Sequence, residues 1–130
     1  MIVDASALLS ILEQEEDAER IARAMGKAGS LSISAATYFE TALVIRGRHG
    51  DKGEEELDLL ARRLQLKIVP FGDGQVGHAR RAFRLYGKGR HPARLNFGDC
   101  MAYALARESG EPLLFKGDDF SQTDIEAAPY

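Results

Sequence analysis

The sequence predicts an α/β fold, in which a mostly parallel central sheet is flanked by helices, over one domain that covers residues 1–130. Three observations lead to this prediction. Short apolar runs of strand length alternate along the chain with longer segments whose apolar residues recur at helical spacing. Hydrophobic residues make up 45% of the 130 residues, which is enough for one buried core. A single cysteine excludes an internal disulfide framework.

The first elements are a strand, two helices and a second strand. Residues 1–3 form a short apolar run that ends at Asp4, and apolar residues then recur at helical spacing as far as Leu12. A second helix is predicted from Asp17 to Met25, where two nearby glycines end it. Residues 30–35 alternate between polar and apolar, as a half-buried strand does.

The middle of the chain is predicted to be mostly helical. A long, mostly apolar helix over residues 35–49 ends near two glycines, and an amphipathic helix follows over residues 54–66. The second of these has acids at its start and bases at its end, the order that the helix dipole favours. A short strand over residues 67–71 and a helix over residues 74–87 complete this part.

A linker rich in glycine, residues 87–95, precedes the last two elements. These are a helix that contains Asp99 and ends at Gly110, and a strand within residues 111–120 that has polar residues just past it. Ligands of such α/β folds gather beyond the carboxyl ends of the strands. The residues that directly follow each strand are therefore the first candidates for a site.

Acidic residues occupy these positions. Asp4 directly follows the first strand, and Glu40 lies in the second turn of the helix after the second strand. Asp118 and Asp119 follow the last strand, and Asp99 lies in the first turn of its own helix. Because the carboxyl ends of parallel strands share one edge of the sheet, we expect the acids that follow the strands to converge, and Asp99 joins them if its helix starts at the same edge.

Each acid also has an ordinary structural explanation. Asp4 and Asp99 could each stabilise a helix N-terminus. Asp118 and Asp119 could be turn residues, and Glu40 could lie at the wet edge of its helix. Glu40 fits this explanation least well, because its neighbours in the sequence are mostly apolar and burial of a lone carboxylate is costly.

Converging carboxylates repel one another, and a divalent cation relieves that repulsion. Hard oxygen ligands select Mg²⁺ or Mn²⁺, whereas a chain with three histidines and one cysteine is a poor candidate for zinc. A site of this kind is suited to phosphodiester hydrolysis, in which the metal activates water and neutralises charge on the phosphate.

Four segments resemble, in order and over essentially the whole chain, the motifs of PIN-domain ribonucleases of the VapC toxin type. They are MIVDASAL, ATYFETALVI, LNFGDCMAYALA and PLLFKGDDF. The sequence YGKGRH followed by LNFGDC is especially specific. The resemblance implies a small α/β fold with a parallel sheet and a Mg²⁺- or Mn²⁺-dependent endoribonuclease activity. It also implies a homodimer and a cognate VapB-type antitoxin.

The resemblance further implies roles for individual residues. Asp4, Glu40 and Asp99 match the three central acids, which would hold the metal. Many relatives place the fourth acid three residues before the Phe of the last motif, where this chain has Gly117. The fourth acid is therefore predicted to be Asp119, which directly precedes that Phe, with Asp118 as the alternative.

Three other residues near these motifs also have expected roles. Ser6 matches a hydroxyl position that supports the site by hydrogen bonding, and Asn96 is expected to fix the start of the Asp99 helix. Cys100 lies among small apolar residues, which favours a buried, inert thiol over a nucleophile.

The segment 78–94 is strongly basic and contains no acidic residue, although the net charge of the chain is −3. RNA binding requires positive charge for the phosphate backbone. The candidate RNA-binding residues are Arg80, Arg84, Lys88, Arg90 and Arg94. A solvated helix face followed by an exposed loop is the structural alternative.

The expected setting is the cytoplasm, because the N-terminus lacks a secretion signal and no apolar run is long enough to span a membrane. Apolar helix faces at residues 7–12 and 41–45 are candidate interfaces, although such faces more often belong to the core.

Two other classes of function remain open. One is a phospho-receiver module with Lys116 after its last strand and Asp73 as a poor acceptor, and the other is a non-enzymatic binding module.

Overall fold

The structure is a computed structural model that describes residues 1–130. Four parallel strands form one sheet in the order β3-β2-β1-β4, which confirms the predicted fold class. The strands are short: β1 Ile2–Val3, β2 Ser32–Ser34, β3 Lys67–Val69 and β4 Leu113–Leu114. Because all four run in the same direction, their carboxyl ends meet at one edge of the sheet.

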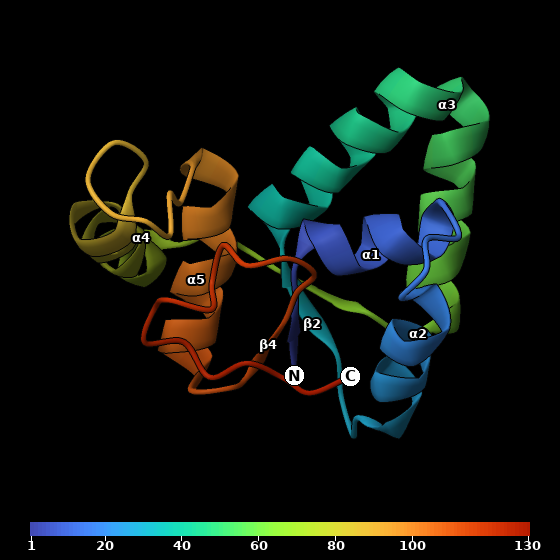
Figure 1. Cartoon of the computed structure of the whole chain (residues 1–130). Coiled ribbons are helices and arrows are strands. Elements are labelled where there is room, and N and C mark those ends of the chain that lie inside the picture. The colour runs from blue at the N-terminus through green and yellow to red at the C-terminus, as the bar shows by residue number, and fades with distance from the viewer.

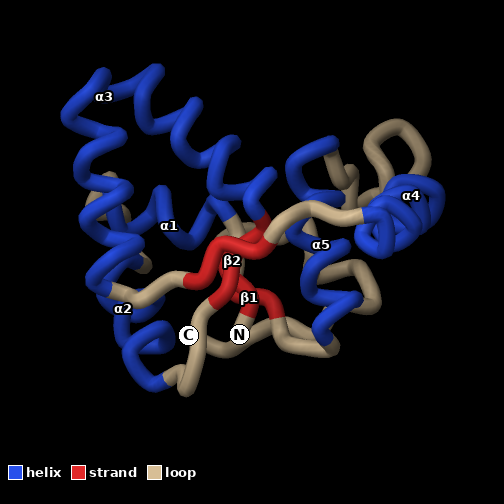
Figure 2. The backbone as a smooth tube through the Cα atoms, turned by 180° about the vertical axis from the view of Figure 1, so that it is seen from behind, coloured by secondary structure: helices blue, strands red, loops and turns tan.

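Helices cover both faces of the sheet (Figure 1). Helices α1, α2 and α3 lie on one face, while α4 and α5 lie on the other, and the view from behind in Figure 2 shows the same two layers. Their bounds are α1 Ala5–Leu12, α2 Ala18–Lys27, α3 Ala35–Arg63, α4 Asp73–Tyr86 and α5 Phe97–Ser109.

The alternation of side chains along the central strands divides the core between these two layers. Ile2 and Leu113 point into a cluster built on α4 and α5. Their neighbours Val3 and Leu114 point into a second cluster built on α1, α2 and α3. Because both faces are buried, β1 and β4 are apolar at every position, as is usual for parallel sheets.

Helix α3 contains both of the helices predicted for the middle of the chain. Gly50 interrupts it with φ 64° and ψ −150°, a conformation that strongly favours glycine. The helix therefore bends sharply, and its two halves diverge from this point in Figure 1. The two predicted helices are thus confirmed, but a kink at a single glycine joins them where a longer break was expected.

The boundaries of the Asp99 helix agree with the prediction: α5 begins at Phe97, so Asp99 lies in its first turn, and the left-handed Gly110 is its C-cap. Other boundaries differ by a few residues. The last strand comprises only Leu113 and Leu114, so the acids after it lie on a loop of several residues. None of the helices combines the length and the apolar character needed to cross a membrane.

Candidate active site

Asp4 connects β1 to α1 and is 6% exposed. It caps α1: its Oδ2 accepts hydrogen bonds from the Ser6 backbone N–H at 3.0 Å and from Ser6 Oγ at 2.6 Å. Burial raises the pKa of Asp4 despite these hydrogen bonds, and the charge of Asp119 raises it further. Asp4 is therefore a helix cap and also a buried acid next to a second carboxylate.

Glu40 lies in the second turn of α3 and is half-buried. Burial raises its pKa, and the charge of Asp4 raises it further. The carboxylate lies against the backbone at the start of α5, because a Cβ atom added at Gly98 would overlap both of its oxygens. The wet-edge explanation for Glu40 is thus insufficient, since this side chain points toward the other acids.

Asp99 lies in the first turn of α5 and forms a capping box with Asn96. Asn96 Oδ1 accepts from the Asp99 backbone N–H at 2.9 Å, and Asp99 Oδ2 accepts from the Asn96 N–H at 2.9 Å. Burial raises the pKa of Asp99 to about 7, against the lowering effect of the Asn96 N–H. The charges of Asp4, Asp119 and Glu40 add to the rise. Asp99 therefore caps α5 and is also a member of the acidic cluster.

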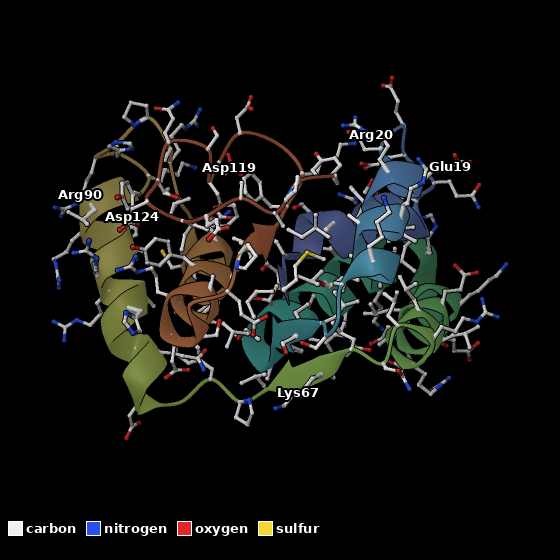
Figure 3. The ribbon with its side chains drawn as sticks, turned by 90° about the horizontal axis from the view of Figure 1, so that it is seen from below. Glu19, Arg20, Lys67, Arg90, Asp119 and Asp124 are labelled. Atoms are coloured by element: carbon white, nitrogen blue, oxygen red, sulfur yellow. The ribbon has the colours of Figure 1, made fainter.

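Asp119, and not Asp118, completes the cluster. Its charge raises the pKa of both Asp4 and Asp99, whereas Asp118 contributes to neither. The backbone carbonyl of Asp118 accepts hydrogen bonds from the N–H and Oγ of Ser121, which stabilise the turn at this point. Figure 3 shows Asp119 on the loop that follows β4.

The structure thus brings together Asp4, Glu40, Asp99 and Asp119 from four separate segments. None of them takes part in an ion pair. No group of three or more Asp, Glu, His or Cys side chains is arranged so that it could hold a metal ion as it stands. The charges of neighbouring carboxylates raise the pKa of Asp4, Glu40 and Asp99, but the four carboxylates do not surround a single point.

Ser6 links two segments of this cluster. Its Oγ donates to Asp4 and accepts a hydrogen bond from the Lys116 backbone N–H at 2.9 Å. It therefore ties the start of α1 to the loop that carries Asp119. Ser6 thus lies next to Asp4, as its match to the motif implied, and Asn96 caps the start of the Asp99 helix, as expected.

Cys100 directly follows Asp99, but it is 4% exposed and unpaired. Burial, together with the charge of Asp99, raises the pKa of its thiol to about 11. A thiol with this pKa stays protonated at neutral pH and is a weak nucleophile. This agrees with the prediction of an inert cysteine.

The basic residues lie on α4 and on the loop after it, and they are not part of the acidic cluster. Arg80 and Arg84 line a groove of about 800 Å³ whose other walls are mainly apolar. Phe71, Val76, Phe83, Phe97 and Met101 contribute to these walls. Lys88, Arg90 and Arg94 belong to the loop before α5, and Figure 3 labels Arg90 beside α4.

Sequence reasoning missed several residues around the site. Phe97 and Phe39 are 79% and 64% exposed, and each is adjacent in sequence to a residue at the acidic cluster, Gly98 and Glu40. Large exposed apolar side chains are informative where they gather. Both phenylalanines lie within the motif segments quoted above, but a motif does not show whether an aromatic residue is buried in the core or exposed.

The parallel sheet and the cluster of acids at its carboxyl edge define a class of nuclease-like α/β domain. The family model of the PIN domain matches residues 1–126, so the chain belongs to the PIN domain family.

Its relatives specify the group within that family. Ribonuclease VapC30 of Mycobacterium tuberculosis is 50% identical over 125 residues, which cover 96% of this chain and 95% of that protein. VapC20 of the same species, a toxin that cleaves the sarcin–ricin loop, has a similar fold, with a TM-score of 0.79 at 16% identity. That similarity covers 99% of this chain and 98% of the VapC20 chain. A toxin–antitoxin complex from Klebsiella pneumoniae gives a TM-score of 0.75 at 15% identity, covering 99% and 97% of the two chains. The chain belongs with the VapC ribonucleases, as its motifs indicated.

This membership argues against the phospho-receiver and the non-enzymatic binding module. The structure gives a further reason against the receiver, because the Lys116 ammonium pairs with Glu15 and lies 3.9 Å from Asp17. Lys116 is therefore committed to the turn between α1 and α2.

Proposed function

We propose that this chain is a Mg²⁺- or Mn²⁺-dependent endoribonuclease that acts as the toxin of a toxin–antitoxin pair. One observation carries the proposal: four carboxylates from four segments gather at the carboxyl edge of the sheet without any cationic partner. The ribonuclease relatives support RNA as the substrate. The chemistry of the donors supports the metal, since Mg²⁺ and Mn²⁺ prefer carboxylate oxygens.

Asp4, Glu40, Asp99 and Asp119 are the residues that would hold the cation. When bound, a divalent cation lowers the pKa of a water molecule and offsets negative charge on the phosphodiester. Ser6 holds the Asp4 carboxylate in one orientation, and Asn96 does the same for Asp99. Glu40 has no such hydrogen bond, so the position of its carboxylate depends on the space left by neighbouring residues.

The protonation state of the cluster supports the same function. With a pKa of about 7, the Asp99 carboxyl retains a proton on about half of the molecules at neutral pH in the absence of a cation. Asp99 would release this proton when the cluster binds a cation, so that binding strengthens as the pH rises. An increase of cation binding with pH is expected of a metal-binding cluster and is not expected of four carboxylates that only cap helices.

RNA would reach the acids across a surface that also carries positive charge. Arg80 and Arg84 take no part in any ion pair, so they are available to phosphate groups. Lys88, Arg90 and Arg94 on the following loop extend this positive surface. Contacts of this kind position the RNA without reading its sequence.

Two partner surfaces follow from the exposed apolar residues. The groove lined by Phe83, Phe97 and Met101 would accept an apolar segment of the antitoxin, with acidic residues of that segment facing Arg80 and Arg84. The exposed side chains of Phe39 and Leu43 on α3 would contact a second copy of the chain. The toxin–antitoxin complex among the structural neighbours supports an antitoxin partner.

The test is cleavage of RNA by the wild-type chain and by Asp4→Asn, each first checked for folding by circular dichroism. We expect cleavage with Mn²⁺, loss of cleavage with EDTA, and a loss of at least about 100-fold in Asp4→Asn, since altering even a group that only orients a metal ligand costs about 10–100-fold. Asp118→Asn is the matched control and should cleave normally. Undiminished cleavage by a folded Asp4→Asn protein would refute the assignment.

A further inference from the structure

We propose that Gly98 is a positioning residue for Glu40: the missing side chain of Gly98 makes the space in which the Glu40 carboxylate stands beside Asp99. The inference rests on the proposed function, because it concerns the same acidic cluster. It assigns a site role to a residue that has no functional group of its own.

The geometry at the start of α5 is the basis of this inference. Asn96 caps the helix, so Phe97 and Gly98 are its first and second residues and Asp99 is the third. A Cβ atom at position 98 would overlap the Cδ and both oxygens of Glu40. Glu40 and Gly98 are far apart in the sequence, so this contact exists only because α3 and α5 begin at the same edge of the sheet.

The backbone does not require glycine at this position. The glycines with positive φ are Gly50, Gly89, Gly110 and Gly117, and Gly98 is not among them. Within a helix, glycine is less favourable than alanine because it gives up more conformational freedom on folding. The space taken by the Glu40 carboxylate is therefore the reason for glycine that the structure offers.

A methyl group at position 98 would displace Glu40 and leave α5 in place. The first turn of α5 is held by two reciprocal hydrogen bonds of 2.9 Å between Asn96 and Asp99. Glu40, in contrast, is a flexible side chain with neither a hydrogen bond nor an ion pair that would resist the displacement. Gly98→Ala should therefore leave the fold intact while it moves one carboxylate away from Asp99.

The chain contains a matched control at the start of α4. Gly74 is the second residue of that helix, as Gly98 is of α5, and its N-cap is Gly72. A Cβ atom at Gly74 would come within 2.7 Å of Glu108 Oε1, so the same kind of clash would occur with a glutamate. Glu108 lies in the last turn of α5, at the opposite end from the acidic cluster.

The test combines Mn²⁺ titration calorimetry with thermal unfolding and RNA cleavage. For Gly98→Ala we expect at least about tenfold weaker Mn²⁺ binding and a similar loss of kcat, the range seen when a group that orients a metal ligand is altered. The unfolding temperature should be unchanged or higher, because alanine is the better helix former. Gly74→Ala should match the wild type in Mn²⁺ binding and in cleavage.

A rescue experiment distinguishes positioning from a general disturbance of the helix. Glu40→Asp withdraws the carboxylate by one methylene, so a methyl group at position 98 no longer meets it. In a double-mutant cycle, we expect Gly98→Ala to weaken Mn²⁺ binding less than about threefold in the Glu40→Asp background. An equal loss in both backgrounds would overturn the inference, as would wild-type Mn²⁺ affinity in Gly98→Ala.

The same data separate this inference from the proposed function. If the wild type binds Mn²⁺ and cleaves RNA but Gly98→Ala does both equally well, only the role of Gly98 is wrong. If the folded wild type neither binds Mn²⁺ nor cleaves RNA, the proposed function fails, and the inference about Gly98 fails with it.

Discussion

Two carboxylates at different turns of α5, those of Asp99 and Asp124, have surroundings that are opposite in charge. Asp99, in the first turn, lies among three other acids and has no cationic partner, and its pKa is raised to about 7. Asp124 accepts a hydrogen bond of 2.7 Å from Tyr103, and Arg81 and Arg107 lie 3.3 and 3.6 Å from its other oxygen. Burial alone would raise the pKa of Asp124, but these neighbours outweigh it and lower the pKa.

The difference distinguishes an acid with a structural role, Asp124, from a candidate site residue, Asp99. The partners of Asp124 stabilise its charge, so this carboxylate joins α4, α5 and the C-terminal segment. The neighbours of Asp99 destabilise its charge, and carboxylates with a pKa perturbed in this way are found most often at functional sites. Proximity to α5 is common to both acids, and it is the sign of the surrounding charge that separates their roles.

The largest expected effect concerns activity. Asp99→Asn removes a charge from the acidic cluster and should lower RNA cleavage in the presence of Mn²⁺ at least about 100-fold, or about 3 kcal/mol of transition-state stabilisation. Asp124→Asn should stay within about twofold of the wild type per folded molecule. The measurement is kcat/KM for both variants, with the folded fraction determined separately. Equal losses in the two variants would mean that the acids do not differ in role.

The second prediction concerns stability, for which Asp124 and not Asp99 is the residue whose loss should be costly. Asp124→Ala should lower the free energy of unfolding by about 2–3 kcal/mol, because it leaves the hydroxyl of the fully buried Tyr103 without an acceptor. Urea denaturation gives this value. The control is the same substitution in a Tyr103→Phe background, where the cost should be smaller because no hydroxyl is left unpaired. A cost below about 0.5 kcal/mol in the wild-type background would contradict the structural role.

The two acids should also give opposite pH dependence of stability in the metal-free protein. The pKa of Asp99 is higher in the folded chain than its ordinary value of 3.8, so the folded state binds more protons between about pH 4 and pH 7. Its contribution to stability is therefore greatest at low pH and is lost as the pH rises toward 7. The pKa of Asp124 is lowered, so its contribution is present above its ordinary value of 3.8 and is lost as the pH falls further.

Asp99→Asn tests this difference. After allowance for the partial exposure of Asp99 to solvent, the substitution should stabilise the metal-free protein at pH 7.5 by about 1–2 kcal/mol. At pH 4.5 the gain should largely disappear. Urea denaturation at both pH values with EDTA present is the measurement, and a gain that is independent of pH would speak against the raised pKa.

The smallest predicted effect is on RNA binding, and it distinguishes an arginine without an acidic partner from one that faces an acid. Arg84 has no acidic partner, so Arg84→Ala should weaken RNA binding several-fold and should reduce the slope of log K against log salt by about 0.7. Arg107, which faces Asp124, should have little effect when changed to Ala. Binding is measured in an Asp4→Asn background so that the RNA stays intact. An identical salt slope for all three proteins would remove Arg84 from the RNA surface.

Much of the fold follows from local patterns in the sequence. The strand preceding Asp4 and the helix containing Asp99 were predicted from apolar spacing, and both occur close to the expected residues. The kink in α3 was harder to predict, because two glycines near the break are compatible with a loop as well as with a bend. Only Gly50 adopts the positive φ that creates the bend.

The acids were predictable because their position depends on connectivity. A residue that directly follows a parallel strand must lie at the carboxyl edge of the sheet, so Asp4 could be placed from the sequence, and the loop that carries Asp118 and Asp119 begins at the same edge. The choice between Asp118 and Asp119 could not be made in the same way. Adjacent residues of a loop point in different directions, and only the course of the loop decides which carboxylate faces Asp4.

The sequence by itself therefore determined the order of the elements, the parallel sheet and the edge at which the acids gather, because these depend on local spacing and on chain direction. The tertiary structure alone decided which groups touch. The contact of Gly98 with Glu40 and that of Tyr103 with Asp124 each join segments that are distant in the chain. Such contacts depend on how helices pack against one sheet, and no local pattern of residues encodes that packing.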